Sequence, residues 1–232
     1  QIPTKNRRGC GYVFCDDFVT PEKAQEELEK NIGKKVEPIR VLKFDSGRQE
    51  KLWIKNVLSI GLCAAFAEPL EATSIHTTIM QLKHFIFSSL GAQIDETCNT
   101  GSVDEYNNTN AHLYDTMKDF LVAHYTCGRN DTEFWKYIDS GATMTPFVKD
   151  LHDLCKIRVP NASLFPRHEG SAGWPLYSYV LAGTGALSDE VCRKEIEYSN
   201  DMRVGDSAYM YHVQEFDKLS KDLPDNTKYI RG

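Results

Sequence analysis

The order of apolar and polar positions divides the chain around residues 57–90. A short apolar run at residues 57–60 ends at Gly61, and an acidic elbow containing Pro69 follows at residues 68–71. Beyond the elbow, apolar residues recur with the i, i+4, i+7, i+11 spacing that places side chains on one face of a helix. They are Ile75, Ile79, Leu82 and Ile86. The spacing predicts a buried helix over this stretch.

The start of this predicted helix has the chemistry of an anion site. Either Thr73 or Ser74 is placed to be the N-cap residue. The free backbone N–H groups and the positive end of the helix dipole then face the elbow, which favours a bound anion. Glu71 lies directly beside that position. Glutamates near helix starts are more often surface charges than catalytic groups, so the residues alone leave both interpretations open.

Small β elements are predicted before the elbow. Residues 38–45 and 49–55 alternate in part between apolar and polar side chains and flank a turn at residues 46–48, which predicts a β-hairpin. Gly9 and Gly11 are expected to form a turn that leads into a strand over residues 11–14. The hairpin feeds the apolar run at residues 57–60, so a small β layer is expected to deliver the chain to the elbow.

The remaining chain has mainly helical signals. A threonine and a proline at residues 20–21 open a first helix that ends near Gly33. Further helices are predicted near residues 104–125, from residue 131, over residues 146–155 and over residues 174–181. The inward stripe of the longest one is expected to be Leu113, Met117, Phe120, Leu121 and His124. His124 is interpreted as a structural core histidine. The fold class is therefore α+β.

Composition narrows the class of protein. The 232 residues are 41% hydrophobic and carry a net charge of −6, so no basic surface for nucleic acid is expected. Seven scattered cysteines form no C-x-x-C pair and no zinc-finger spacing, which favours reduced thiols, no metal site and a cytoplasmic location. No apolar run reaches membrane-spanning length, so no membrane partner is expected. The chain begins at Gln1 without methionine, and we expect a fragment of a longer enzyme.

Residues 59–76, S-I-G-L-C-A-A-F-A-E-P-L-E-A-T-S-I-H, resemble the flavin- and halide-site segment of the flavin-dependent tryptophan halogenases. The family pattern there is S-I-G-L-x-x-x-F-x-E-P-L-E-[SA]-T-[GS]-I. Shorter matches are Q-I-P at residues 1–3, R-R-G-x-G-Y-V at 7–13, F-x-x-G-R-x-x-x-x-W-x-x-N at 44–56 and A-G-x-G at 182–185. The resemblance is dense in the first ninety residues and sparser as far as residue 185.

The resemblance implies the C-terminal part of an FAD-binding, glutathione-reductase-like fold. Residues 1–90 are then the end of the FAD- and halide-binding domain, and residues 91–232 are a mainly helical region that covers the substrate. The dinucleotide-binding G-x-G-x-x-G and the segment of the catalytic lysine do not occur in these residues, and Lys83 does not replace that lysine. The fragment alone is therefore expected to be inactive.

The implied activity is that of a flavin-dependent halogenase. In that family reduced FAD (FADH2) and O2 turn a bound halide, which is chloride, bromide or iodide, into hypohalous acid. The oxidant reaches the active-site lysine, where a small aromatic substrate is halogenated. A separate flavin reductase supplies the FADH2. Whether the protein forms a homodimer is left open.

The resemblance also implies roles for individual residues. Glu71 matches the catalytic glutamate, which also contacts the substrate. Thr73 and Ser74 match the halide site, although the family usually has glycine at the second position. Leu62 and Ile75 match positions that contact the flavin. The elbow and the start of the helix would thus contain most of the chemistry.

The sequence leaves alternatives open for the substrate and for the type of reaction. Trp174 is a candidate for stacking on a substrate ring, and Glu169 for binding an ammonium group. The tyrosine pair that holds free tryptophan in the family is missing before Trp174, so free tryptophan is not favoured. Ala72 stands where many members have serine, which removes a hydroxyl beside Glu71. An FAD-dependent monooxygenase or reductase of the same fold, and a helical interaction module without catalysis, remain alternative hypotheses.

Overall fold

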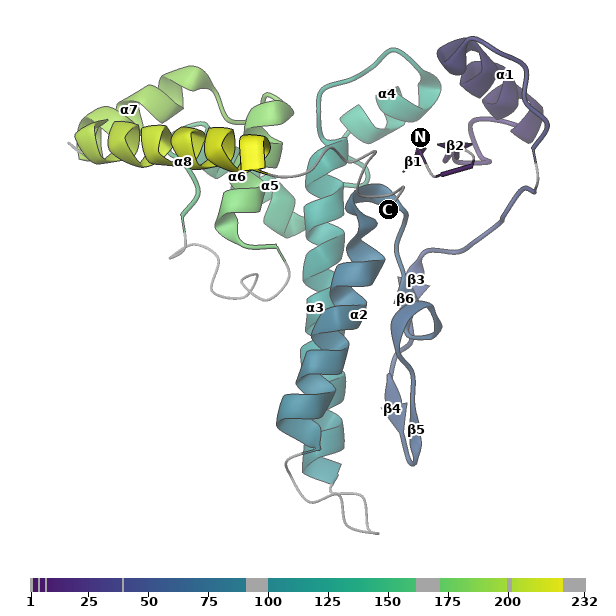
Figure 1. Ribbon diagram of the computed structural model, residues 1–232. Helices are drawn as coiled ribbons and strands as arrows, with labels where there is room; N and C mark the ends of the chain where they lie inside the picture. The colour runs from purple at the N-terminus through teal and green to yellow at the C-terminus, as the bar shows by residue number, and fades with distance from the viewer. Residues whose placement is uncertain are drawn as a thin grey trace. The chain divides into compact units, whose positions relative to one another are not determined.

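The computed structural model describes residues 2–3, 5–6, 8–38, 40–90, 100–161, 172–199 and 202–222. Within these ranges the chain is mainly helical, with short strands in antiparallel pairs (Figure 1). Two compact units are present. One combines Gln1–Pro38 with Cys192–Gly232, and the other is Ile39–Val191. The mixture of helices and small β pairs agrees with the predicted α+β class.

The first unit contains short strands and terminal helices. Strand β1 (Ile2–Pro3) pairs antiparallel with β2 (Arg8–Gly9). The strand predicted at residues 11–14 was wrong, because these residues have no partner strand in the described chain and stay irregular. The C-terminal part of this unit contains α8 (Met202–Asp222), and α7 (Asp189–Ser199) leads into it.

Helix α1 (Pro21–Ile32) begins and ends as its sequence predicts. The hydroxyl of Thr20 accepts a hydrogen bond from the backbone N–H of Lys23, and Pro21 takes the first helical position. Gly33 closes the helix with a φ of 73°, a left-handed conformation that glycine adopts without a steric penalty.

The β elements of the second unit differ from the predicted hairpin. Strand β3 (Gly47–Arg48) pairs with β6 (Ala65–Phe66), and β4 (Trp53–Ile54) pairs with β5 (Val57–Leu58). The predicted hairpin between residues 38–45 and 49–55 was therefore wrong. The chain forms its hairpin one turn later, at the two-residue loop 55–56, where Lys55 has a φ of 53°. The second predicted strand therefore pairs forward with β5 and not back with residues 38–45.

The side chain of Asn107 fixes the β4–β5 hairpin to a long helix. Its Oδ1 accepts hydrogen bonds of 2.8 Å from the backbone N–H groups of both Leu52 and Trp53, and its Nδ2 donates to the Trp53 carbonyl at 2.9 Å. The Trp53 ring meets the edges of Phe85 and Tyr106, each with ring centroids 5.5 Å away. This cluster anchors the strands that lead to the elbow.

Helices α2 (Thr73–His84) and α3 (Thr100–Tyr125) lie side by side, and a π-helical turn, η3 (Phe85–Ser89), extends α2 (Figure 1). The buried side chains of α2 are polar and belong to Thr73, Thr77 and Gln81. Across the pair, Asn110 bonds to His84 at 2.9 Å. Helix α2 is therefore held by hydrogen bonds as well as by apolar contacts.

The apolar stripe of α2 is exposed, so the prediction that it forms the buried face was wrong. Ile75 is 65% exposed, Ile79 50%, Leu82 39% and Ile86 50%. Hydrogen bonds satisfy part of the buried polar face, while the Nε2 of Gln81 has no partner in the described chain. The Thr77 hydroxyl donates to the Thr73 carbonyl at 3.1 Å, and the Gln81 amide oxygen accepts from the Gly61 N–H at 3.1 Å. These bonds, which periodicity does not reveal, let the polar face turn inward.

The other side of α3 carries the helical part of the second unit. The predicted apolar stripe of α3 is buried at Leu113, Met117, Phe120 and Leu121, as predicted. Helices α4 (Glu133–Asp139), α5 (Pro146–Cys155) and α6 (Trp174–Gly183) follow. The fully buried Tyr177 places its ring 5.1 Å from that of Phe120, between centroids, and so joins α6 to α3. None of the described helices is both long and apolar enough to cross a bilayer.

Candidate active site

The elbow between β6 and α2 is a tight reversal of the backbone. A 3-10 turn, η2 (Leu70–Ala72), follows Pro69, and the N–H of Ala72 donates to the Pro69 carbonyl at 3.3 Å. Glu71 and Ala72 both adopt left-handed conformations, with φ values of 56° and 51°. Such conformations are uncommon outside glycine and concentrate at functional sites. The reversal places Glu71 directly before the first turn of α2.

The N-cap prediction for α2 was wrong by one or two residues. Ala72 occupies the N-cap position, and Thr73 is the first helical residue. The left-handed Ala72 lets α2 begin immediately after the 3-10 turn, which leaves neither Thr73 nor Ser74 outside the helix to cap it. A capping side chain is therefore missing at the start of α2.

A larger side chain at Ala72 is expected to destabilise the protein. Ala72→Val should lower the free energy of unfolding by about 1–2 kcal/mol, because β-branching worsens the left-handed strain. Ala72→Gly is the matched control and should equal or exceed the wild type, since glycine adopts this φ freely. Denaturant unfolding followed by circular dichroism measures both. Equal losses in the two variants would contradict the strain explanation.

The backbone amides at the start of α2 are not equivalent. The N–H of Thr73 donates to the Leu70 carbonyl and is occupied. Ser74 and Ile75 follow at the second and third helical positions, whose N–H groups a capping oxygen would normally engage. Ala72 has no such oxygen. Thr73 is 5% exposed and Ser74 is half-buried, so an anion at this end would meet the Ser74 amide first.

Two exposed apolar side chains flank this helix start. Leu62 belongs to the 3-10 turn η1 (Gly61–Cys63), which packs against α2, and it is 69% exposed. Ile75 in the first turn of α2 is 65% exposed. The turn can approach α2 because residue 61 is glycine. Gly61 has a φ of 64°, and a Cβ there would lie 3.4 Å from the Thr78 hydroxyl. Exposed apolar surface of this kind can pack against a flat ring.

The last turn of α3 contacts both glutamates of the elbow. The Tyr125 hydroxyl donates a 2.6 Å hydrogen bond to Glu68 Oε2. The next residue back, His124, lies with Nε2 3.9 Å from Glu71 Oε1; the side chains are 17% and 58% exposed. The Nδ1 of His124 donates to the Phe120 carbonyl at 2.8 Å, which fixes the ring. Glu71 itself is thus accessible to a ligand from one side.

Glu68 is half-buried, whereas Glu71 is exposed. Burial raises the pKa of the Glu68 carboxyl, while the Tyr125 hydrogen bond and the nearby His124 oppose that rise. Burial, and then the Glu68 carboxylate, raise the pKa of Tyr125, so its phenol stays protonated as a donor. Glu68 Oε1 is buried and has no hydrogen-bond partner among the described residues.

Sequence reasoning missed these contacts. It gave Glu68 and Tyr125 no role, and it assigned His124 to the core. The available signal was the pair of carboxylates three residues apart at Glu68 and Glu71. The spacing could not show that the end of a helix more than fifty residues later meets them.

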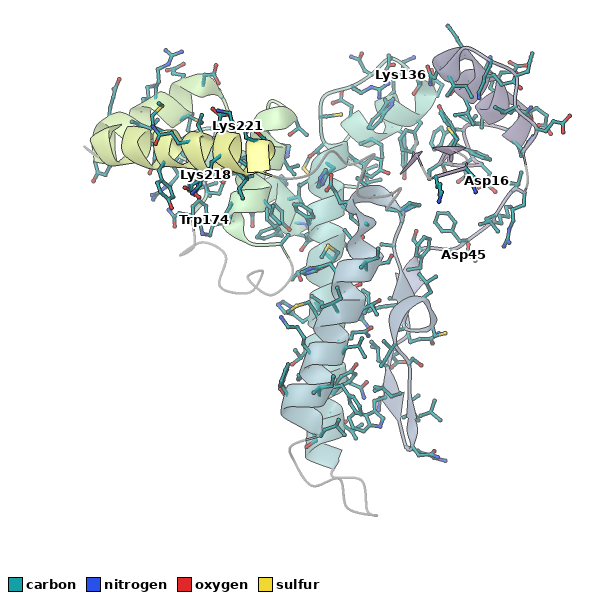
Figure 2. All side chains as sticks on the ribbon, in the orientation of Figure 1. Asp16, Asp45, Lys136, Trp174, Lys218 and Lys221 are labelled. Carbon is teal, nitrogen blue, oxygen red and sulfur yellow. The ribbon has the colours of Figure 1, made fainter. Side chains whose placement is uncertain are left out.

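Trp174 lies apart from the elbow in the described contacts. It is the first residue of α6 and is 37% exposed (Figure 2). No described hydrogen bond or ring contact joins it to Glu71. Glu169 lies outside the residues that the structure describes. Across the described ranges, no group of three or more histidine, cysteine or acidic side chains is arranged to hold a metal ion.

Comparisons with known proteins show which family the chain resembles. The family described as tryptophan halogenase matches residues 1–194. The chain is 34% identical over 196 residues to the tryptophan 6-halogenase SttH of Streptomyces toxytricini, covering 80% of this chain and 35% of that protein. It is 32% identical over 197 residues to the 7-chloro-L-tryptophan 6-halogenase KtzR of Kutzneria sp. (strain 744), covering 80% and 36%.

A solved structure gives the same result at the level of the fold. Tar14, a tryptophan C-6 flavin-dependent halogenase from taromycin biosynthesis, superposes with a TM-score of 0.74 and 25% identity, covering 95% of this chain and 44% of that one. The chain belongs to the tryptophan halogenase family. It spans about a third of the length of the curated relatives it matches.

Proposed function

We propose that this chain forms the flavin- and halide-site part of a flavin-dependent halogenase that acts on a small aromatic substrate. The observation that carries the proposal is the position of Glu71, beside the uncapped start of α2 and the exposed side chains of Leu62 and Ile75. Residues 1–90 would complete an FAD-binding, glutathione-reductase-like domain, and residues 91–232 would cover the substrate. Family membership supports both assignments.

The start of α2 is proposed to hold the halide. The backbone N–H of Ser74 and the positive end of the helix dipole attract an anion without placing a cationic side chain in front of it. Thr73 is proposed to line the halide site with its buried side chain. Its own N–H cannot bind the halide, because it already donates to the Leu70 carbonyl. Serine stands at residue 74, where the family usually has glycine.

Leu62 and Ile75 are proposed to contact the flavin. Their exposed side chains offer apolar surface on two elements that pack together, and η1 keeps its place through the Gly61–Gln81 hydrogen bond. When bound, FADH2 and O2 would supply the oxidising equivalents that convert the halide to hypohalous acid. A separate flavin reductase would provide the FADH2, and a cytoplasmic location would suit the reduced thiols.

Glu71 is proposed to act on the aromatic substrate. Its carboxylate can stabilise positive charge that develops on the ring and can accept the ring proton at Oε1 or Oε2. His124 Nε2 lies 3.9 Å from Oε1 and offsets part of the negative charge when its ring is protonated. Trp174 is proposed to stack on the substrate from α6, by an apolar contact between rings. An aromatic compound other than free tryptophan fits the missing tyrosine pair.

The proposal is tested with the whole protein, a flavin reductase, NADH, FAD and a panel of indoles and phenols in chloride or bromide. We expect products whose mass rises by one halogen and whose isotope pattern follows the halide supplied. Omitting FAD or the halide should remove them. Hydroxylated products that form equally without halide would show a monooxygenase and overturn the proposal.

A further inference from the structure

We propose that Tyr125, Glu68 and His124 form a clamp that positions the Glu71 carboxylate. The clamp consists of the last turn of α3 and the two carboxylates of the elbow. It rests on the proposed halogenase function for its catalytic meaning, but its geometry stands on the contacts alone. Glu68, Tyr125 and His124 are positioning residues, because of these four side chains only that of Glu71 would touch the substrate.

The first half of the clamp fixes the beginning of the elbow. The 2.6 Å bond from the Tyr125 hydroxyl to Glu68 Oε2 joins a side chain of α3 to the residue that precedes Pro69. Glu68 and Glu71 are separated only by Pro69, which has a φ of −73°, and by Leu70 in the 3-10 turn. This stretch has little conformational freedom, so a shift of Glu68 is transmitted to Glu71.

The second half of the clamp meets Glu71 itself. The His124 ring is held by its Nδ1 bond to the Phe120 carbonyl and by the edge-on contact with the Phe120 ring, whose centroid is 4.6 Å away. Its Nε2 lies 3.9 Å from Glu71 Oε1, which is too long for a strong hydrogen bond, and it attracts the carboxylate when the ring is protonated.

The arrangement uses the pitch of the helix. Consecutive residues on an α-helix point about 100° apart, so His124 and Tyr125 face in different directions from the same turn. Each meets one of the two glutamates, and the elbow is therefore held on two sides of the end of α3. Because Glu71 is 58% exposed, burial does not fix its position, and the clamp does so instead.

The test uses Tyr125→Phe in the whole protein, with Tyr106→Phe as the matched control. Tyr106 is a buried tyrosine on the same helix, and its hydroxyl has no partner in the described part of the chain. Both variants lose one hydroxyl, but only Tyr125→Phe loses an elbow contact. Hydrogen exchange of the amides of Ala72 and Thr73 reports directly on the turn, since these N–H groups bond to Pro69 and Leu70.

In Tyr125→Phe we expect the elbow amides to exchange at least about threefold faster, with no change in Tyr106→Phe. The rate of halogenated product should fall about tenfold or more through kcat, while KM for the substrate and the rate of O2 consumption change little, because a misplaced catalytic group wastes oxidant. His124→Gln should lower the product per O2 in the same direction.

The outcomes separate the clamp from the proposed function. Unchanged elbow exchange in Tyr125→Phe, or equal increases in both variants, would overturn the clamp whatever the activity. Faster exchange with an unchanged ratio of product to O2 would also overturn it as a positioning device. If the wild type makes no halogenated product, the proposed function fails, and a selective rise in elbow exchange still supports the clamp as a structural contact.

Discussion

Glu71→Gln is expected to abolish halogenation in the whole enzyme. Glutamine has nearly the same shape as glutamate but no charge and no basic oxygen, so it cannot stabilise a cationic ring or take its proton. Catalytic groups of this kind contribute about 10²–10⁴-fold, and we expect a loss of at least about 100-fold in product formation. Mass spectrometry of the product, with bromide as the halide, measures the loss.

The same variant should still oxidise reduced flavin. The proposed halide site at Ser74 and the proposed flavin contacts at Leu62 and Ile75 are unchanged, so hypohalous acid should still form and can be trapped by a soluble phenol. Glu50→Gln, on an exposed carboxylate outside the elbow, is the matched control and should keep full activity. Halogenation at more than a tenth of the wild-type rate in Glu71→Gln would remove Glu71 from the catalytic step.

Asn107→Ala is expected to cause the largest loss of stability. The Asn107 side chain is 7% exposed and satisfies two backbone N–H groups and one carbonyl in the β4–β5 hairpin. Each buried polar group left without a partner costs about 1–3 kcal/mol. We therefore expect the free energy of unfolding to fall by about 3 kcal/mol, measured by urea titration of the full chain.

Asn108→Ala provides the control for this experiment. Asn108 is the exposed neighbour on the same helix, and alanine there should change stability by less than about 0.5 kcal/mol. A loss below about 1 kcal/mol in Asn107→Ala would mean that water enters the site and replaces the amide. The hairpin would then be held mainly by the Trp53 cluster.

Helices with explicit end signals were predictable from the sequence. The threonine and proline before α1 and the glycine after it set bounds that the structure confirms, and Pro146 opens α5 as predicted. The buried stripe of α3 was also correct, because Phe120 and its neighbours meet Tyr177 of α6 on one face. In these helices, the local sequence signals and the tertiary contacts favour the same structure.

The orientation of α2 was not predictable from periodicity. An apolar stripe indicates which residues share a face but not whether a partner covers that face. Here the Thr77 hydroxyl and the Gln81 amide oxygen have hydrogen-bond partners, and the Gln81 partner is the N–H of the distant Gly61. The hairpin prediction failed for a similar reason, since Asn107 of another element holds the backbone of Leu52 and Trp53.

The candidate site divides in the same way. The elbow, Glu71 and the helix start are contiguous in sequence and could be found there. The position of Ala72 as an N-cap residue without a capping side chain could not be predicted, because its left-handed conformation depends on the turn around it. Neither could the contacts of His124 and Tyr125, which reach the elbow only after α2 and α3 have folded together.

The outward-facing aliphatic row on α2 has a practical consequence for handling the protein. Ile75, Ile79 and Leu82 form part of an exposed apolar band, which favours self-association of the protein in water. Ammonium sulfate, which strengthens contacts between such bands, should promote precipitation at modest concentration. Mild detergent or low ionic strength should keep the molecules apart. Purification buffers can be chosen on that basis.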